Sequence, residues 1–239
     1  MDTSDLDPRI GDKGSAPPTP DVLLFDVYET LSDLSPLGAR FVDVGAPAQV
    51  ARTWLATLLL DGLALTAARA QAHFALLAEG TLRSSLAVLP LNRHLDEAVA
   101  HIMGGFDVLE VHSDVPTGLP ALAALGPRLV TLSNAEVSVA EKLFARAGLS
   151  GHFERHLSTD DAGIWKPAPA AYAYAAGRCR SRAGAMMLVA VHPWDINGAH
   201  LAGFRTAWIN RTGATYPEYF NAPTMEATSL VHLAHQFSN

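Results

Sequence analysis

The chain has 239 residues, of which 49% are hydrophobic and 17% charged, and its formal net charge is −7 at pH 7. This composition is typical of a globular protein that can bury a sizeable core, and it excludes a disordered chain. Because the balance is acidic and no basic run occurs, we expect neither nucleic acid nor a membrane as partner. The single cysteine, Cys179, excludes an intrachain disulfide and favours a reducing compartment.

The N-terminal segment, residues 1–20, is expected to be a flexible tail. It is acidic, ends in a proline-rich stretch, and lacks the basic and apolar regions of a signal peptide. No apolar stretch is both long and charge-free enough to span a bilayer. The nearest candidate, Leu55 to Leu65, is interrupted by Asp61 and Gly62. We therefore expect a soluble, cytoplasmic protein.

The first predicted strand is an apolar run from Leu23 that leads directly into Asp26, followed by a short polar turn and Leu31. This pattern predicts a buried strand whose carboxyl end presents one aspartate where open α/β sheets bind their ligands. Asp26 is then either a nucleophile or an ordinary strand-end residue that caps the next turn.

The secondary structure predicted for the rest of the chain changes near residue 112. The segment from Pro36 to Gly105 is rich in alanine and leucine and predicts helices, at Pro47–Leu60, Ala64–Ala78 and His94–Met103. Thereafter helices and strands alternate. Helices are predicted at Leu119–Leu125, from the Ser133-Asn134 cap to Ala147, and at Pro167–Arg178; strands are predicted at Arg128–Leu132, Phe153–Leu157, Met187–Val191 and finally Arg205–Asn210.

This alternation predicts the fold class: α/β, a doubly wound, Rossmann-like parallel sheet with right-handed crossovers. The helical block separates the first strand from the others, so it is predicted to be a cap inserted after that strand. The predicted boundaries are residues 21–35 and 112–239 for the core and 36–111 for the cap.

Polar residues stand at the carboxyl ends of the predicted strands. Taken singly, each has a structural explanation as a helix cap or a solvated loop residue. Together they form one layer, as a doubly wound site requires. The group comprises Asp26 and Thr30, then Ser133 and Asn134, then Lys166, then His192 to Asp195.

These motifs, in this order, resemble the haloacid dehalogenase (HAD) superfamily, and within it the 2-haloacid dehalogenase (type II) branch. The resemblance runs from Asp21 to the C-terminus. It is carried by Asp26-Val27-Tyr28-x-Thr30, Leu132-Ser133-Asn134, Lys166-Pro167 and Trp194-Asp195-x-x-Gly198-Ala199, and also by Trp54-Leu55, Trp208-Ile209-Asn210-Arg211 and Ala227-Thr228-Ser229-Leu230.

The resemblance implies displacement of a halide by the Asp26 carboxylate, followed by hydrolysis of the ester at the Asp26 carbonyl carbon. Lys166 would keep Asp26 ionised, and Asp195 would orient Lys166 and the hydrolytic water. The other residues that the resemblance assigns are Thr30, Ser133 and Asn134, which would hold Asp26 and the substrate carboxylate, and Tyr28, Tyr172 and Trp194, which would line the site.

Two positions separate this branch from the phosphatases of the superfamily. Phosphatases carry a second aspartate where this chain has Tyr28, and a halide, unlike an alkoxide, leaves without a proton. They also bind Mg²⁺ through an acid where this chain has Ala190. Both differences count against phosphoryl transfer, and we expect neither a metal nor a cofactor.

Three positions depart from the branch pattern. Glu29 replaces a glycine, and if the backbone there needs a positive φ, a glutamate is strained. The cap arginine that holds the halide is replaced by Ala46, and neither Arg40 nor Arg52 matches it in register. His192 stands where the family has an asparagine. It is the preferred replacement for the missing arginine, as a donor to the halide or carboxylate or as a base for water, although a structural loop histidine is equally compatible.

The expected function is therefore hydrolytic dehalogenation of a small 2-haloalkanoic acid. A smaller halide pocket without the arginine would favour fluorinated substrates. The alternatives are a Mg²⁺-dependent small-molecule phosphatase and a catalytically altered relative that binds a small acid. The expected partners are a small anionic organic acid and a halide, with a homodimer expected by analogy to the branch.

Overall fold

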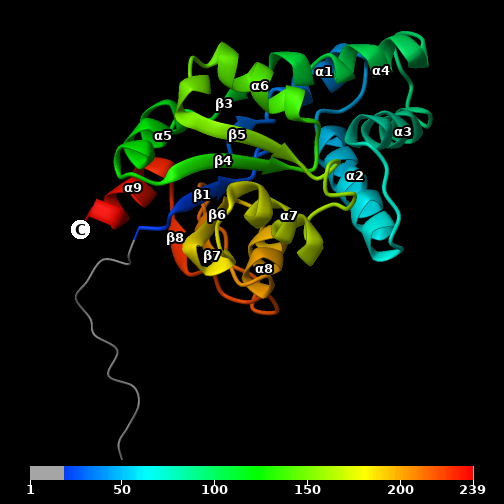
Figure 1. The fold of residues 1–239 in the computed structure, drawn as a ribbon. Helices are drawn as coiled ribbons and strands as arrows, with labels where there is room; N and C mark the ends of the chain where they lie inside the picture. The colour runs from blue at the N-terminus through cyan, green and yellow to red at the C-terminus, as the bar shows by residue number, and fades with distance from the viewer. Residues whose placement is uncertain (1–18, 239) are drawn as a thin grey trace, which may run out of the picture.

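The computed structural model describes residues 19–238, so the predicted tail lies almost entirely outside the described residues. A six-stranded parallel sheet forms the centre, in the order β5-β4-β1-β6-β7-β8 (Figure 1). Its strands are β1 (Val22–Phe25), β4 (Arg128–Ser133), β5 (Phe153–Ser158), β6 (Met186–Ala190), β7 (Arg205–Ile209) and β8 (Met225–Ala227).

The central strand β1 is apolar throughout and buried on both faces, as parallel strands covered by helices are. Leu23 and Phe25 belong to one hydrophobic cluster and Leu24 to another, so successive side chains enter different layers. One layer holds α5 (Val115–Ala124), α6 (Val137–Arg146) and α9 (Leu230–Ser238); the other holds α7 (Pro169–Cys179) and α8 (Pro193–Leu201). The predicted doubly wound α/β fold is confirmed.

Four helices lie between β2 and β3 and form what we call the cap. They are α1 (Leu37–Asp43), α2 (Val50–Ala67), α3 (Phe74–Leu86) and α4 (Leu95–Met103), and the short 3-10 helix η1 (Phe106–Val108) follows them. The chain leaves and re-enters the core through β2 (Ser32–Asp33) and β3 (Glu110–Val111), which pair antiparallel. Figure 1 shows α2 and α3 beyond the arrowheads of β4 and β5, so the cap adjoins the carboxyl edge of the sheet.

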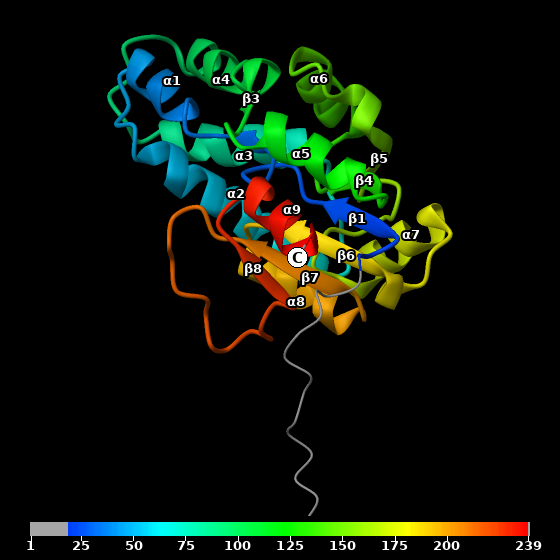
Figure 2. The same cartoon turned by 90° about the vertical axis from the view of Figure 1, so that its left-hand side faces the viewer.

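Three expectations about the helices and strands are wrong. The helix predicted at Ala64–Ala78 is two helices, because α2 ends at Ala67 and α3 begins only at Phe74, with Arg69 in the left-handed region at φ 57°. Helix α6 begins at Val137, so Ser133 and Asn134 do not cap it. The predicted last strand is followed by β8 and α9, and Figure 2 shows α9 beside α5.

Helix α2 also corrects the expectation that no stretch is long and apolar enough for a bilayer. It has 18 residues with a mean hydropathy of 1.3, because Arg52 and Asp61 are its only charges. By length and composition alone it could cross a membrane. In the fold its buried residues recur along the helix. Ala51, Trp54 and Leu58 belong to the hydrophobic cluster shared with α1 and α3, and Gly62 lies against Trp165.

Candidate active site

Asp26 is the first residue after β1, and its carboxylate is almost fully buried. The side chain is 7% exposed and accepts hydrogen bonds from Thr30 Oγ1 at 2.7 Å and from Lys166 Nζ at 2.8 Å. Its backbone N–H donates to the carbonyl of Val189 at 3.1 Å, which extends the pairing of β1 with β6 by one residue. The strand thus delivers Asp26 to the carboxyl edge of the sheet.

The turn after Asp26 has a strained backbone at Glu29. Glu29 has a φ of 60°, in the left-handed region that glycine adopts without cost. Its carbonyl accepts a hydrogen bond from His112 Nε2 at 2.8 Å. Thr30 follows in the turn, and its hydroxyl also accepts the N–H of Val191 at 3.1 Å, which fastens the turn to the end of β6. The strain expected of a glutamate here is therefore present.

Lys166 is fully buried and joins two aspartates. Its ammonium lies 2.8 Å from Asp26 Oδ1 and 2.6 Å from Asp195 Oδ2. Asp195 lies in the first turn of α8, and its other oxygen accepts the hydroxyl of Tyr172 at 2.6 Å. This arrangement is the one expected from the sequence, in which Lys166, Asp195 and Tyr172 lie around Asp26.

The charges around Lys166 decide which carboxylate is ionised most readily. Burial by itself raises the pKa of Asp26, but the charges of Lys166 and His192, together with hydrogen bonds, outweigh it and lower that pKa. Burial lowers the pKa of Lys166, but its two carboxylate partners raise it above its usual range. Burial raises the pKa of Asp195, which Lys166 only partly offsets. Asp26 is therefore the more acidic of the two carboxylates that Lys166 binds.

Ser133 and Asn134 lie at the end of β4, buried beside this group, but they bind backbone rather than Asp26. Ser133 Oγ accepts the N–H of Ala135 at 3.0 Å. Asn134 Oδ1 accepts the N–H of Lys166 at 2.9 Å and the hydroxyl of Thr159 at 3.3 Å. Asn134 thus fixes the backbone of Lys166. In the part of the chain that the structure describes, neither residue forms a hydrogen bond to Asp26.

His192 approaches Asp26 from the opposite side to Lys166. Its Nε2 lies 3.7 Å from Asp26 Oδ2, 3.6 Å from Glu29 Oε2 and 3.3 Å from the carbonyl of Tyr28. Its ring stacks on Trp194 with centroids 5.1 Å apart, and the Trp194 ring lies 6.0 Å from Lys166 Nζ. His192 therefore stands between two carboxylates, where it can donate to or accept from a group held at Asp26.

The cap supplies no arginine at the position equivalent to that of the family. Ala46 is buried there, and Arg40 is used inside the cap, where its guanidinium donates to the carbonyl of His101. Arg52 lies in a cleft of about 780 Å³ between cap and core. This cap–core cleft is lined by Glu29, Gln49, Arg52, Val191, Pro193 and Arg211, among others. Glu29 lines the cleft and its carboxylate lies 3.6 Å from His192 Nε2, whereas Asp26 is not among the lining residues.

Sequence reasoning missed an aromatic layer between the cap and Asp26. The Tyr28 ring stacks on Phe74 of the cap with centroids 5.0 Å apart, and Phe74 stacks on Trp165 at 5.9 Å. We call Tyr28, Phe74 and Trp165 the aromatic layer. Burial raises the pKa of the Tyr28 phenol far above its usual value, with the charges of Glu136 and Asp107 adding to the effect. The only sequence signal was that Trp165 directly precedes the Lys166-Pro167 motif.

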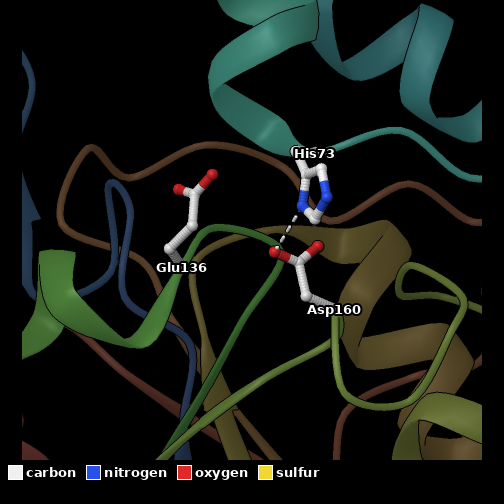
Figure 3. A group of neighbouring side chains, drawn as sticks. All are labelled: His73, Glu136 and Asp160. Atoms are coloured by element: carbon white, nitrogen blue, oxygen red, sulfur yellow. Dashed lines mark hydrogen bonds and ion pairs between the residues drawn. The ribbon is translucent and has the colours of Figure 1, made fainter.

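A second polar group spans the cap and the core beside this layer. It consists of His73, Glu136 and Asp160. One imidazole nitrogen of His73 and one carboxylate oxygen of each acid lie within 4.8 Å of one another. Figure 3 shows the His73 imidazole facing Asp160, with Nδ1 and Oδ2 3.0 Å apart, while the Glu136 carboxylate stands to the side. His73 precedes α3 of the cap, and the two acids follow β4 and β5, so the pair links cap to core.

The residues around Asp26 do not match the oxygen ligands that Mg²⁺ requires. The buried carboxylates of Asp26 and Asp195 are both bound to the Lys166 ammonium. Ala190, at the end of β6, presents a methyl group where an acid is needed to complete the set. We therefore derive no step through a metal ion.

Comparisons with known proteins agree with this geometry. A family model described as haloacid dehalogenase-like hydrolase matches residues 20–203. The chain is 29% identical over 211 residues to an (S)-2-haloacid dehalogenase of Pseudomonas sp. (strain YL), covering 87% of this chain and 90% of the relative. It is 33% identical over 130 residues to haloacetate dehalogenase H-2 of Moraxella sp. (strain B), covering 52% of this chain and 57% of the relative.

Among solved structures, a dehalogenase with an intermediate complex superimposes with a TM-score of 0.85 at 25% identity. The match covers 93% of this chain and 99% of that structure, so both the cap and the core are included. The family model, for its part, matches well over half of the chain. The chain therefore belongs to the haloacid dehalogenase-like hydrolase family.

Proposed function

We propose that the protein hydrolyses a small 2-haloalkanoic acid to the corresponding 2-hydroxy acid, with Asp26 as the nucleophile. The observation that carries the proposal is a buried carboxylate kept ionised by Lys166 at 2.8 Å and facing the cap. Relatives named for the dehalogenation of (S)-2-haloacids and of haloacetate supply the substrate class. An ionised carboxylate removed from water is a stronger nucleophile than a solvated one.

In the first step, a carboxylate oxygen of Asp26 attacks the carbon that bears the halogen. A C–O bond forms as the C–X bond breaks, and the electron pair leaves with the halide, so the product is an ester of Asp26. No proton is transferred. Lys166 holds Asp26 in place through Oδ1, and Thr30 holds it through Oδ2.

In the second step, water attacks the carbonyl carbon of the Asp26 ester. The hydroxy acid departs with its new oxygen, Asp26 regains its carboxylate, and one proton is released. His192, whose Nε2 lies 3.7 Å from Asp26 Oδ2, is the candidate acceptor of that proton, and Asp195 holds Lys166 throughout. Trp194 and Tyr172 keep His192 and Asp195 in position through the contacts described above.

The identity of residue 28 favours a halide over an alkoxide as leaving group. An alkoxide or phosphate ester needs an acid to protonate the departing oxygen, and Tyr28 stands where phosphatases of the family carry that acid. Burial raises the pKa of Tyr28 well above its usual value, so its phenol is a poor proton donor. A halide pocket without an arginine at position 46 would be smaller, which favours short substrates and fluoride among the halides.

The test is halide release, measured with ion-selective electrodes for fluoride and chloride. The substrates are fluoroacetate, chloroacetate and both enantiomers of 2-chloropropionate, each with and without EDTA. We expect release that EDTA does not change and that Asp26→Asn abolishes. Asp21→Asn is the matched control, because Asp21 precedes the amino end of the same strand and is exposed. The absence of any halide release, or EDTA-sensitive hydrolysis of p-nitrophenyl phosphate, would overturn the proposal.

A further inference from the structure

Trp165 carries a buried hydrogen-bond donor that no group of the described chain accepts. Its side chain is 2% exposed, and its Nε1 has no hydrogen-bond partner. Two other buried indoles are paired, since Trp54 Nε1 donates to the carbonyl of Ala78 at 3.0 Å and Trp208 Nε1 donates to that of Val191 at 2.9 Å. A buried unpaired N–H is costly and uncommon in folded proteins, so a ligand is a natural acceptor for it.

The unpaired donor lies in the aromatic layer between the cap and Asp26. Trp165 directly precedes Lys166, which binds Asp26, and its ring stacks on Phe74 at an interplanar angle of 24°. Phe74 in turn stacks on Tyr28, which follows Asp26 in the turn. Both ends of the layer are therefore attached to the immediate surroundings of the nucleophile.

The orientation of the indole follows from its contact with α2. A Cβ placed on Gly62 would lie 2.1 Å from Cζ3 and 2.4 Å from Cε3 of Trp165. The six-membered ring of the indole is thus pressed against the cap helix, and this contact requires glycine there. Nε1 lies at the opposite end of the indole, so it points away from α2.

The surroundings define the chemistry of the missing acceptor. It must accept a hydrogen bond without needing one in return, and it must be compact enough to sit among packed rings. Ring edges carry partial positive charge, so such a place suits an anion better than a neutral carbonyl. The arginine that the family pattern places in the cap is replaced here by Ala46, so it is not available to bind the halide. A halide ion meets these conditions.

We propose that Trp165 Nε1–H binds the halide as it is displaced, which rests on the dehalogenation proposed above. As the bond from carbon to Asp26 forms and the C–X bond breaks, the halide takes the bonding electron pair and accepts the indole N–H. No proton moves. The interaction strengthens as negative charge develops on the leaving atom, so it stabilises the transition state more than the substrate.

The discriminating variant is Trp165→Phe, which removes the N–H and keeps an aromatic ring. The measurement is kcat/KM for fluoroacetate, chloroacetate and bromoacetate, since this ratio covers the step in which the halide leaves. We expect a fall of about 10- to 100-fold, as for loss of a hydrogen bond to a charged group, and the largest fall for fluoride, the strongest acceptor. An equal factor for all three leaving groups, or no fall, would overturn the assignment.

Trp54→Phe is the matched control, because it makes the same change at a buried indole whose N–H is already paired inside the cap. We expect it to lower the melting temperature while leaving the ratios among the three substrates unchanged. If Trp54→Phe alters those ratios as much as Trp165→Phe does, the effect reflects packing of the cap and the assignment is wrong.

Halide binding separates this inference from the proposed function. Sodium bromide is titrated at constant ionic strength while the melting temperature is recorded, because a ligand that binds only the folded protein raises it. The wild type and Trp54→Phe should both show the rise, and Trp165→Phe should not. A wild type that releases no halide from any substrate but shows this pattern refutes the proposed function alone. A wild type with no rise refutes the halide site.

Discussion

Substitutions at Glu29 separate the effect of its backbone conformation on stability from the effect of its carboxylate on activity. Its φ of 60° is one that only glycine adopts without strain, and its carboxylate lies 3.6 Å from His192 Nε2. Glu29→Gly removes both the strain and the carboxylate. Glu29→Ala removes the carboxylate but keeps a Cβ in the left-handed region. Neither variant has the carboxylate, so they differ in backbone strain and in the flexibility of the unfolded chain.

The expected magnitude follows from the cost of the left-handed conformation. A residue with a Cβ pays about 1–2 kcal/mol there, and glycine loses roughly 0.5–1 kcal/mol of that advantage through its more flexible unfolded chain. We expect Glu29→Gly to be more stable than Glu29→Ala by about 1 kcal/mol. For a chain of this size that difference corresponds to a melting temperature higher by about 2–4 °C. The Glu29 carboxylate is 45% exposed, so its own ion pair contributes little to stability.

The two variants should nevertheless lose activity together. Both lack the carboxylate that lies 3.6 Å from His192 Nε2. If that carboxylate helps to hold the imidazole beside Asp26, kcat for chloroacetate should fall in both variants on the order of 10-fold. The assays are thermal melting and steady-state chloride release on the two purified variants. The reasoning is refuted if Glu29→Ala melts at or above Glu29→Gly, or if the activity follows backbone strain instead of the carboxylate.

Two further predictions concern the charges around Asp26. Lys166→Met leaves two buried carboxylates without their ammonium. The free energy of unfolding, measured in urea at pH 7, should therefore fall by about 3–5 kcal/mol. A loss below about 1 kcal/mol would contradict the buried ion pair. His192→Asn removes one of the charges that lower the pKa of Asp26; because the ionised carboxylate is the nucleophile, the acid limb of the kcat/KM profile should move to higher pH, and an unchanged or lower limb would contradict this role.

Much of the site could be predicted because strand ends are predictable. Asp26, Lys166 and Asp195 are far apart in sequence, yet each follows a strand, or the loop after a strand, of one parallel sheet. The carboxyl ends of such strands share one edge, so the sequence order of the motifs was enough to bring these side chains together. The contact distances confirm the grouping but not the chemical role of each residue, which stays a prediction.

The features that the sequence did not predict depend on contacts that leave no local pattern in the sequence. Ser133 and Asn134 have the right position, but they accept hydrogen bonds from backbone N–H groups and from Thr159 instead of binding Asp26. A motif does not specify which partner a hydroxyl or amide takes. Phe74 reaches Trp165 only because the helical block folds back over the sheet. The break between α2 and α3 leaves little trace in the sequence, because three of the six intervening residues are alanine, a strong helix former.

The nucleophilic role of Asp26 is tested most directly by a single turnover in H₂¹⁸O, with enzyme in excess over chloroacetate. The protein is digested afterwards, and the peptide that contains Asp26 and the hydroxy acid are both weighed by mass spectrometry. If water attacks the Asp26 ester, the label enters the Asp26 carboxylate and the first hydroxy acid formed is unlabelled. Label in the hydroxy acid with none in that peptide would show that water attacks the substrate carbon directly, and would contradict the account.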